Sequence, residues 1–264
     1  MAHMKRVLTI AGSDSGGGAG IEADIKTISA LGAYACTTIT AVTAQNTLGV
    51  AGVHTLPAEF VRLSIETVLA DIGADAVKLG MLANAGIIRA VSEALPLGLP
   101  IVLDPVMVAT SGAVLLPDDA IDALKERLLP RAVLVTPNLP ELAKLTGQSI
   151  EAVPARLEAA RALLALGAQA VLVKGGHDHQ PFLVDYLVTP DSVEEIGFDR
   201  IETSNTHGTG CTMASAIATG LAQGLGLLAA TRRARLYLQQ AIISAPGFGQ
   251  GHGPLNHLVC GFDL

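Results

Sequence analysis

The sequence predicts an α/β fold with a mostly parallel central sheet and helices on both faces. Short apolar segments alternate along the chain with longer stretches of helical periodicity, which is the pattern of repeated β-α units. The short segments are apolar throughout, as expected for parallel strands that are covered on both sides. Half of the 264 residues are hydrophobic and only 3% are aromatic, so Ala, Val, Leu and Ile must fill the core.

Strands are expected where short apolar, β-branched segments end in glycine, proline or polar residues. In chain order they cover residues 6–11, 36–43, 50–56, 76–80, 101–103, 133–136 and 171–174. From residue 182 to 201 the pattern changes to alternation about a turn at Pro190-Asp191, which predicts an antiparallel insert or a sheet edge. The sequence leaves open whether the 180–201 insert is a lid or an oligomer edge.

Helices are expected between these strands, where apolar residues recur at helical spacing. Pro57 starts one such stretch, Pro117 is placed as the N1 proline of another, and Asn84 is placed to cap a third that reaches Leu95. In chain order the expected helices cover residues 21–31, 57–71, 84–95, 117–129, 141–145, 155–166 and 213–221.

One domain is predicted over residues 5–264, because no repeat, linker or composition break divides the chain. Residues 1–4 are interpreted as a cloning remnant or an unstructured start. A net charge of −7 without a basic cluster argues against nucleic acid or an anionic membrane as partner. No apolar run reaches the ~18 residues of a membrane span, and no signal peptide is recognised. Three well-separated cysteines favour a reducing compartment, the cytoplasm.

The segment Asn205-Thr206-His207-Gly208-Thr209-Gly210-Cys211-Thr212 is the strongest candidate site. Glycines flanking a threonine just before a helix let several backbone N–H groups point at one spot, which the helix dipole makes suitable for a phosphate. Cys211 lies at the same helix N-terminus, where the pKa of a thiol is expected to fall. An anion cradle beside an ionisable group suggests phosphoryl transfer. The alternative is a glycine-rich turn with a buried, inert cysteine.

Polar residues also gather where the parallel strands end, the edge at which such sheets bind ligands. Asn138 and Glu141 are spaced to share a hydrated Mg²⁺, or else to cap a helix start. Lys174 is placed to reach a transferring phosphate or to be a solvated charge. Asp104 either joins them or is a turn residue before Pro105. Together these residues indicate a Mg²⁺-nucleotide site at one edge of the sheet.

Two further segments give weaker signals. The glycine-rich loop 12–20 lies between a strand and a helix, yet a dinucleotide fingerprint would need glycine at Ile21 and a Walker loop would need it at Ile25. The loop is therefore interpreted as a close approach of the backbone to a ligand such as a flat ring. The tripeptide His177-Asp178-His179 has metal-binding residue types but is interpreted as solvent-exposed. Cys36 and Cys260 are interpreted as structural.

A set of short blocks covers essentially the whole chain from Lys5. They are Ala11-Gly12-Ser13-Asp14, Gly17-Gly18-Ala19-Gly20-Ile21, Ala23-Asp24-Ile25-Lys26, Ala44-Gln45-Asn46-Thr47, Leu79-Gly80-Met81-Leu82, Leu103-Asp104-Pro105-Val106-Met107, Thr136-Pro137-Asn138-Leu139-Pro140-Glu141, Lys174-Gly175-Gly176-His177 and the segment 205–211. In this combination the chain resembles the hydroxymethylpyrimidine/phosphomethylpyrimidine kinases of thiamine biosynthesis. The resemblance implies a ribokinase-like fold and ATP- and Mg²⁺-dependent phosphorylation of a pyrimidine hydroxymethyl group and then of its monophosphate. Ser15 stands where many members have a proline.

The resemblance implies a role for each matching residue at the pyrimidine end of the site. Gln45 would hydrogen-bond the aminopyrimidine edge, and Asp24 would lie beside the substrate. The residues that would wall the ring are Gly12, Met81 and Val106.

At the phosphate end, the resemblance implies an anion hole, nucleotide contacts and a Mg²⁺ site. The anion hole would comprise Gly208, Gly210 and Cys211; the nucleotide contacts Lys174, Thr206 and Thr209; and the Mg²⁺ site Asp104, Asn138 and Glu141. In the wider superfamily an aspartate stands at the position of Cys211. The expected partners are a small pyrimidine and a second copy of the chain, as a homodimer.

Three other functions compete with this interpretation. A pyridoxal kinase of the same subgroup is the closest, but Gln45 favours a pyrimidine because an amide pairs with both a ring nitrogen and an exocyclic amine, which pyridoxal lacks. A non-catalytic nucleotide or pyrimidine sensor would not need Lys174, Glu141 and Cys211. A dinucleotide oxidoreductase is excluded by the glycine register of the 12–20 loop.

Overall fold

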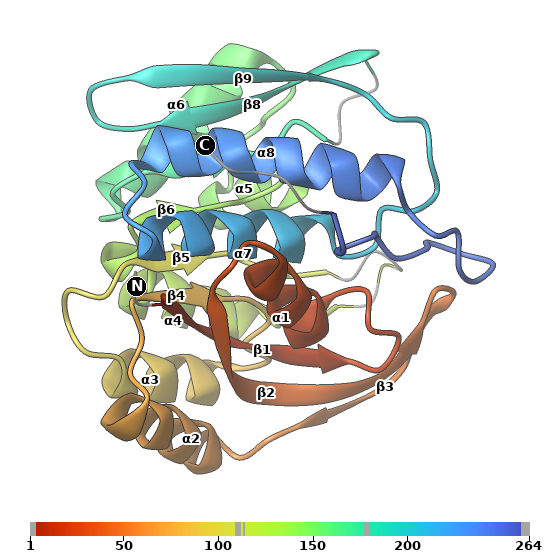
Figure 1. Ribbon diagram of the computed structural model, residues 1–264. Helices are drawn as coiled ribbons and strands as arrows, with labels where there is room; N and C mark the ends of the chain where they lie inside the picture. Colours follow the sequence, from red (N-terminus) through yellow and green to blue (C-terminus); the bar gives the residue numbers. More distant parts are fainter. Residues whose placement is uncertain (1–3, 109–111, 113, 177–179, 260–264) are drawn as a thin grey trace.

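A nine-stranded sheet forms the centre of the molecule in the computed structural model, which describes residues 4–108, 112, 114–176 and 180–259 (Figure 1). The strands are β1 Arg6–Asp14, β2 Tyr34–Asn46, β3 Gly49–Thr55, β4 Ala76–Leu79, β5 Ile101–Leu103, β6 Leu134–Val135, β7 Val171–Val173, β8 Phe182–Val188 and β9 Val193–Asp199. Their spatial order is β3-β2-β1-β4-β5-β6-β7-β8-β9. The six strands from β2 to β7 in this order are parallel, whereas β3, β8 and β9 pair antiparallel at the edges. The predicted α/β class is confirmed, and residues 182–201 form the predicted antiparallel edge.

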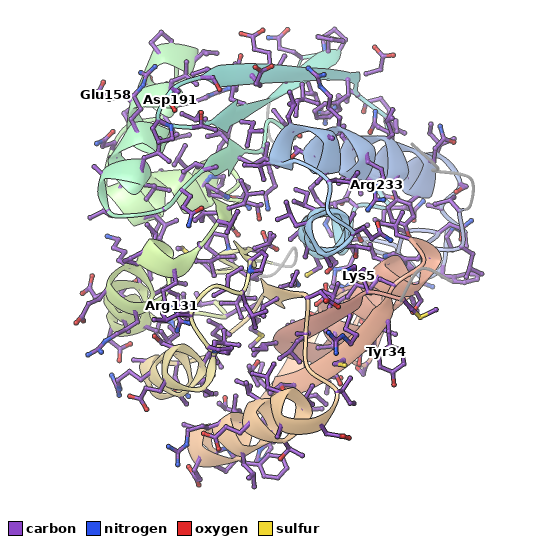
Figure 2. The ribbon with its side chains drawn as sticks, turned by 60° about the vertical axis from the view of Figure 1, so that its left-hand side comes forward. Lys5, Tyr34, Arg131, Glu158, Asp191 and Arg233 are labelled. Atoms are coloured by element: carbon purple, nitrogen blue, oxygen red, sulfur yellow. The ribbon has the colours of Figure 1, made fainter. Side chains whose placement is uncertain are left out.

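Helices cover both faces of the sheet, as Figures 1 and 2 show from two directions. They are α1 Gly20–Ala30, α2 Ala58–Asp71, α3 Ala85–Ala94, α4 Asp118–Arg127, α5 Leu139–Thr146, α6 Val153–Ala165, α7 Thr209–Ala222 and α8 Leu227–Ile243, with a 3₁₀ turn at Leu129–Arg131. Helices α2 to α6 pack on one face, and α1, α7 and α8 pack on the other. Successive strand residues point to opposite faces. Leu8 therefore belongs to the first core and Val7 to the second.

Several element boundaries differ from those that the sequence predicts. Helix α7 begins at Thr209 rather than Met213, so residues 209–212 of the candidate segment form its first turn and Gly208 is its N-cap. Pro117 occupies the N-cap of α4 rather than the N1 position, and α8 was not predicted. The cap at Asn84 is confirmed, because its side chain accepts a hydrogen bond from the N–H of Ile87.

The remaining observations concern Tyr34, the lengths of the helices and the residues outside the described ranges. Tyr34, at the start of β2, is half exposed and points away from the body of the molecule (Figure 2). Within the described ranges, none of the helices has the length and apolarity needed to cross a bilayer. The tripeptide His177-Asp178-His179, interpreted as solvent-exposed, and Cys260, interpreted as structural, both lie outside the described residues.

Candidate active site

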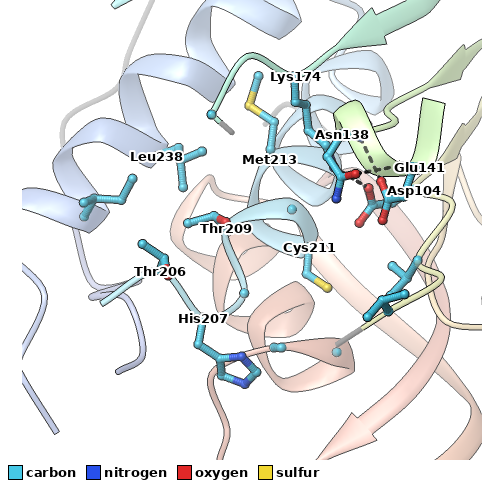
Figure 3. Close-up of a pocket in the computed structure, with 18 of the residues that line it drawn as sticks. Asp104, Asn138, Glu141, Lys174, Thr206, His207, Thr209, Cys211, Met213 and Leu238 are labelled. Atoms are coloured by element: carbon cyan, nitrogen blue, oxygen red, sulfur yellow. Dashed lines mark hydrogen bonds and ion pairs between the residues drawn. The ribbon is translucent and has the colours of Figure 1, made fainter. Parts of the chain in front are cut away.

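A cavity of about 630 Å³ opens at the carboxyl ends of the parallel strands, the edge at which such sheets bind ligands. Figure 3 shows Lys174, Asp104, Asn138 and Glu141 on one side of it, His207 on another, and the first turn of α7 between them. All predicted site residues except Asp24 line this cavity. They are Gly12, Gln45, Met81, Asp104, Val106, Asn138, Glu141, Lys174, Thr206, Gly208, Thr209, Gly210 and Cys211.

The predicted anion cradle includes the N-terminus of α7. Gly208 caps this helix in the left-handed conformation, with φ 84°, and a Cβ there would collide with the carbonyl oxygen of Gly18. The left-handed conformation and the lack of space for a Cβ both require glycine at this position. The first N–H groups of a helix have no acceptor inside it, so this turn presents donors and the positive end of the dipole to the cavity. No side chain caps the turn.

Cys211 lies in this first turn, but its ionisation differs from the sequence prediction. Burial raises the pKa of its thiol to about 11. The charge of Lys78 and the N–H of Gly20 act in the opposite direction, and the charges of Asp24 and Asp104 reinforce the rise. The prediction of a lowered pKa is wrong, because desolvation of the thiolate outweighs the local donors. The resting side chain is a neutral thiol.

Asp24 does not lie beside the substrate cavity, contrary to the role that the resemblance implies. Its side chain is fully buried between β1, β4, α1 and α7, where Lys78 Nζ contacts both carboxylate oxygens at 2.8 Å. Ser215 donates a hydrogen bond to Oδ1 at 2.6 Å, and Thr9 donates one to Oδ2. The charges of this ion pair act on Cys211, and that of Lys78 also acts on Asp104. Sequence reasoning missed Lys78, although a lysine inside an otherwise apolar strand was a signal for a buried partner.

Lys174 forms a second buried ion pair at the cavity surface. Its Nζ lies 2.9 Å from Asp104 Oδ1, and Thr136 donates a hydrogen bond to the same oxygen at 2.9 Å. Burial opposes ionisation of Asp104, but the charges of Lys174 and Lys78 hold its pKa below the usual range. A Cβ built on Gly210 would lie 3.3 Å from both Lys174 Nζ and Asp104 Oδ2. The pair therefore borders the anion cradle, and Lys174 is not a solvated surface charge.

Asn138 and Glu141 form a reciprocal capping box at the start of α5. Asn138 Oδ1 accepts from the N–H of Glu141 at 2.9 Å, and Glu141 Oε2 accepts from the N–H of Asn138 at 2.8 Å. Asn138 and Glu141 therefore cap a helix start, as the alternative interpretation expected, and both residues also line the cavity. Burial raises the pKa of Glu141 to about 7; Lys174 opposes the rise, and the nearby Asp104 adds to it.

A histidine–aspartate pair, which sequence reasoning did not identify, lies on the opposite wall. His207 Nε2 is 2.8 Å from Asp14 Oδ2, and both side chains line the cavity. Burial opposes ionisation of Asp14, but hydrogen bonds from His207, Gln45 and the loop backbone hold its pKa well below the usual range. The available signal was the position of His207 inside the predicted anion cradle. The pairing itself joins residues 193 positions apart.

The residues predicted to wall a flat ring are together in this part of the cavity. β1 has an irregular register against β2 between Ala11 and Ser13, which places Gly12 at the cavity. A Cβ on Gly12 would lie 2.9 Å from Met81 Sδ, so glycine leaves room for the ring wall. Val106, the third predicted wall residue, also lines the cavity, as does Gln45, which is predicted to bind the polar edge of the ring.

The β8–β9 hairpin, whose role the sequence left open, contributes to the far wall of the cavity through Leu183 and Phe198. Asp185 of β8 is fully buried, accepts the N–H of Gly175 at 2.8 Å and pairs with Arg235 of α8. The Arg235 guanidinium lies 3.9 Å from the centre of the Phe198 ring. These contacts fix the hairpin to α8 and to the turn that follows Lys174.

The sequence matches the phosphomethylpyrimidine kinase family over residues 14–256. It is 50% identical over 260 residues to the thiamine biosynthesis bifunctional protein ThiED of Geobacter sulfurreducens. This alignment covers 98% of the present chain and 53% of the length of that relative. Identity to the hydroxymethylpyrimidine/phosphomethylpyrimidine kinase of Rhizobium meliloti is 49% over 254 residues, covering 95% of the chain and 96% of the relative.

Solved structures with the same fold include kinases named for two different substrates. A Bacillus subtilis pyridoxal kinase in complex with ADP aligns with a TM-score of 0.88 and 35% identity, covering 96% of this chain and 97% of its own. A phosphomethylpyrimidine kinase from Clostridium difficile aligns with a TM-score of 0.80 and 40% identity, covering 90% and 99%. The predicted ribokinase-like α/β architecture is confirmed, and the fold alone does not separate the two substrates.

Proposed function

The chain belongs to the phosphomethylpyrimidine kinase family, and we propose that it phosphorylates 4-amino-5-hydroxymethyl-2-methylpyrimidine, and then the monophosphate to the diphosphate, in thiamine biosynthesis. The chain is a phosphotransferase, as its family indicates. ATP is the proposed phosphoryl donor, in keeping with the ADP complex of the structurally similar pyridoxal kinase.

One observation carries this proposal: a single cavity is lined both by groups suited to a flat polar ring and by groups suited to a phosphate. Gln45 and Met81 belong to the first kind, and Lys174 and the first turn of α7 belong to the second. Phosphoryl transfer needs little covalent chemistry from the protein, because positioning and charge stabilisation supply most of the rate. The cavity can hold the acceptor hydroxyl near the cradle while Lys174 faces the charge that develops on the transferring group.

The donor set fits a Mg²⁺ ion that binds together with a nucleotide. Mg²⁺ keeps several waters and takes one or two protein carboxylates plus substrate phosphates. Asp104 and Glu141 would supply the carboxylates, and Asn138 would hold Glu141 in place through the capping box. Among the described residues, no three His, Cys, Asp or Glu side chains form a metal cluster of their own. When bound, the ion would neutralise phosphate charge. Thr206 and Thr209 would contact the nucleotide beside the cradle.

Pyridoxal kinase activity is the second candidate, because pyridoxal kinases share the fold. The test is mass spectrometry of the products formed from ATP with the aminopyrimidine alcohol or with pyridoxal. The proposal expects the pyrimidine mono- and diphosphate. Pyridoxal phosphate as the main product would support the rival, and no product from either would favour a binding sensor. The cytoplasmic location and the homodimer stay predictions.

Gln45→Leu should weaken binding of the aminopyrimidine by ~1–3 kcal/mol while the fold is kept. The physical reason is that the polar edge of the ring would face a side chain that can neither donate nor accept. Calorimetry of the pyrimidine alcohol measures the effect, and ADP affinity serves as the control because it should not change. Wild-type pyrimidine affinity in the variant would contradict the assignment of Gln45.

Lys174→Met should lower turnover about 10²-fold and affect ATP binding much less, because the cation acts on charge that develops during transfer. Steady-state kinetics at saturating ATP would measure this. Lys5→Met removes an exposed lysine outside the cavity and should leave turnover unchanged. Turnover at the wild-type level in Lys174→Met would mean that the lysine only balances the charge of Asp104.

A further inference from the structure

Residues 251–257, which we call the C-terminal tail, contact the segment that leads into the predicted anion cradle. The N–H of His207 donates to the carbonyl oxygen of Gly253 at 3.2 Å. The tail also contacts the turn between β2 and β3, because the N–H of His252 donates to the carbonyl oxygen of Thr47 at 2.9 Å. The tail is therefore hydrogen-bonded to the entry of the cradle as well as to the edge of the sheet.

His257 is a buried histidine of this tail that the proposed reaction does not use. Its side chain is 3% exposed, and its Nε2 lies 3.0 Å from the hydroxyl oxygen of the fully buried Thr212. Burial lowers the pKa of His257 to about 4, and the charge of Lys26 acts in the same direction, so the ring is neutral at physiological pH. A neutral imidazole has one nitrogen that donates and one that accepts, and a hydroxyl can pair with either. The contact is therefore a hydrogen bond in both tautomers.

The hydroxyl of Thr212 is used differently from those of Thr219 in α7 and Thr231 in α8. These two threonines each donate to the carbonyl oxygen four residues earlier, at 2.7 and 2.8 Å, which is a common local bond for a threonine inside a helix. Thr212 is bonded instead to His257, 45 positions away. Its hydroxyl therefore joins the first turn of α7 to the C-terminal tail. Tyr237 of α8 in turn holds the tail there, because its hydroxyl donates to the carbonyl oxygen of His257 at 2.9 Å.

Thr212 is the residue at which the regular hydrogen bonds of α7 begin. Its N–H donates to the carbonyl oxygen of Gly208, the N-cap, at 2.9 Å. The N–H groups of Gly210 and Cys211 come before this bond, so they are available to an anion in the cavity. No side chain caps this end of the helix, and uncapped helix ends fray. The tail supplies the missing support, because it binds the chain on both sides of these two N–H groups.

We propose that His257 is a positioning residue for phosphoryl transfer: its hydrogen bond to Thr212 holds the N–H groups of Gly210 and Cys211 in the direction that the transferring phosphoryl group requires. This inference rests on the proposed function, and neither His257 nor Thr212 lines the cavity. Donors lower the barrier when they are already aimed at the charge that develops, so a looser first turn should reduce kcat more than it raises KM. Because the alcohol and the monophosphate use the same cradle, both steps should be affected equally.

Thr212→Val is the first test, because valine keeps the volume of the side chain and removes only the hydroxyl. At saturating Mg-ATP, kcat for the pyrimidine alcohol and for its monophosphate should both fall by about tenfold or more, while KM changes by less than about threefold. Thr212→Ser keeps the hydroxyl and should retain most of the turnover. Wild-type kcat in the valine variant would overturn the inference, and so would equal losses in the valine and serine variants or an effect on KM alone.

A double-mutant cycle tests whether His257 acts through Thr212. His257→Ala should lower kcat for both steps by the same factor as Thr212→Val, and the double variant should be no slower than the slower single variant, because each change removes the same hydrogen bond. Losses that multiply in the double variant would overturn the inference. His252→Ala is the matched control: this histidine of the same tail is exposed and binds Thr47 through its backbone, so its replacement should leave turnover unchanged.

Amide hydrogen exchange, followed by NMR, keeps the inference separate from the proposed function and from folding. The Thr212 N–H should lose about tenfold or more of its protection in His257→Ala relative to His252→Ala, while the amides of β1 keep theirs. Equal protection in the two variants would overturn the inference. Exchange needs no substrate, so it decides the inference even if neither ring is phosphorylated, an outcome that would refute the function alone. If His257→Ala does not fold, the Met213 N–H gives the same readout in Thr212→Val, with Thr212→Ser as the control.

Discussion

Replacing Asp24 with alanine is expected to lower the free energy of unfolding by about 3–5 kcal/mol, the cost of leaving one member of a buried ion pair without its partner. Lys78 and Asp24 are both fully buried, and the carboxylate also accepts hydrogen bonds from Thr9 and Ser215. One carboxylate thus joins β1, α1, β4 and α7. Its removal leaves an ammonium group in the core with no counter-charge, and two hydroxyl groups without an acceptor.

Denaturant unfolding monitored by circular dichroism measures this effect, and two variants make it specific. Glu66→Ala breaks an ion pair with Arg62 whose side chains are about half exposed, and it should change stability by less than ~0.5 kcal/mol. Asp24→Ala combined with Lys78→Met removes both charges and should recover much of the loss. If Asp24→Ala is as mild as Glu66→Ala, or if the double variant is no more stable than the single one, the pair does not carry the energy assigned to it.

The layered fold was predictable because the relevant signals are local. A segment such as Ile101–Leu103 is apolar on both faces, which a strand covered by two helical layers requires. Helix limits were less predictable. Helix α7 starts at Thr209 because Gly208 caps it in a left-handed conformation. Gly208 also packs so closely against Gly18 that no Cβ would fit, and this contact is visible only in the structure. Helix α8 was not predicted because three arginines interrupt its apolar pattern at residues 232–235, and two of them, Arg233 and Arg235, are buried in the structure.

The part of the candidate site that lies at the carboxyl ends of the parallel strands was predictable. The carboxyl ends of parallel strands meet at one sheet edge, so Asp104 and Lys174, 70 positions apart, were expected to lie together. Pairs in which this rule does not place both partners were not predictable. The contact of Asp24 with Lys78 and that of Asp14 with His207 follow from tertiary packing, and nothing in the local sequence names the partner.

The pKa of Cys211 was also not predictable from the local sequence, because it depends on burial in the folded chain. The helix N-terminus is visible in the sequence and favours a thiolate. Burial depends on the whole fold and acts in the opposite direction, and it is the larger effect. A thiol with a pKa of about 11 is almost entirely protonated at neutral pH, so any role as a base must proceed through a minor ionised form.

Cys211→Ala is expected to lower phosphorylation of the pyrimidine alcohol by ~10²–10⁴-fold and largely to spare phosphorylation of the monophosphate. An alcohol must lose its proton as it attacks phosphorus, so a nearby base accelerates that step. A phosphate monoester has a second pKa near ~6 and already carries an ionised oxygen at neutral pH. It needs the anion cradle, which alanine leaves intact because the backbone of α7 supplies it. Both rates are measured at pH 7.5 with saturating Mg-ATP.

The pH dependence of the two steps separates the roles that Cys211 could have. Because its thiolate fraction rises tenfold per pH unit below a pKa of about 11, the alcohol step of the wild type should accelerate by ~10²-fold between pH 7 and 9. The monophosphate step should be nearly flat over this range, and Cys211→Ala should lose the slope of the alcohol step. If both steps fall by the same factor in the variant, the side chain shapes the anion cradle and is not a base. If neither step falls, Cys211 is a structural cysteine, and the proton of the alcohol leaves by another route.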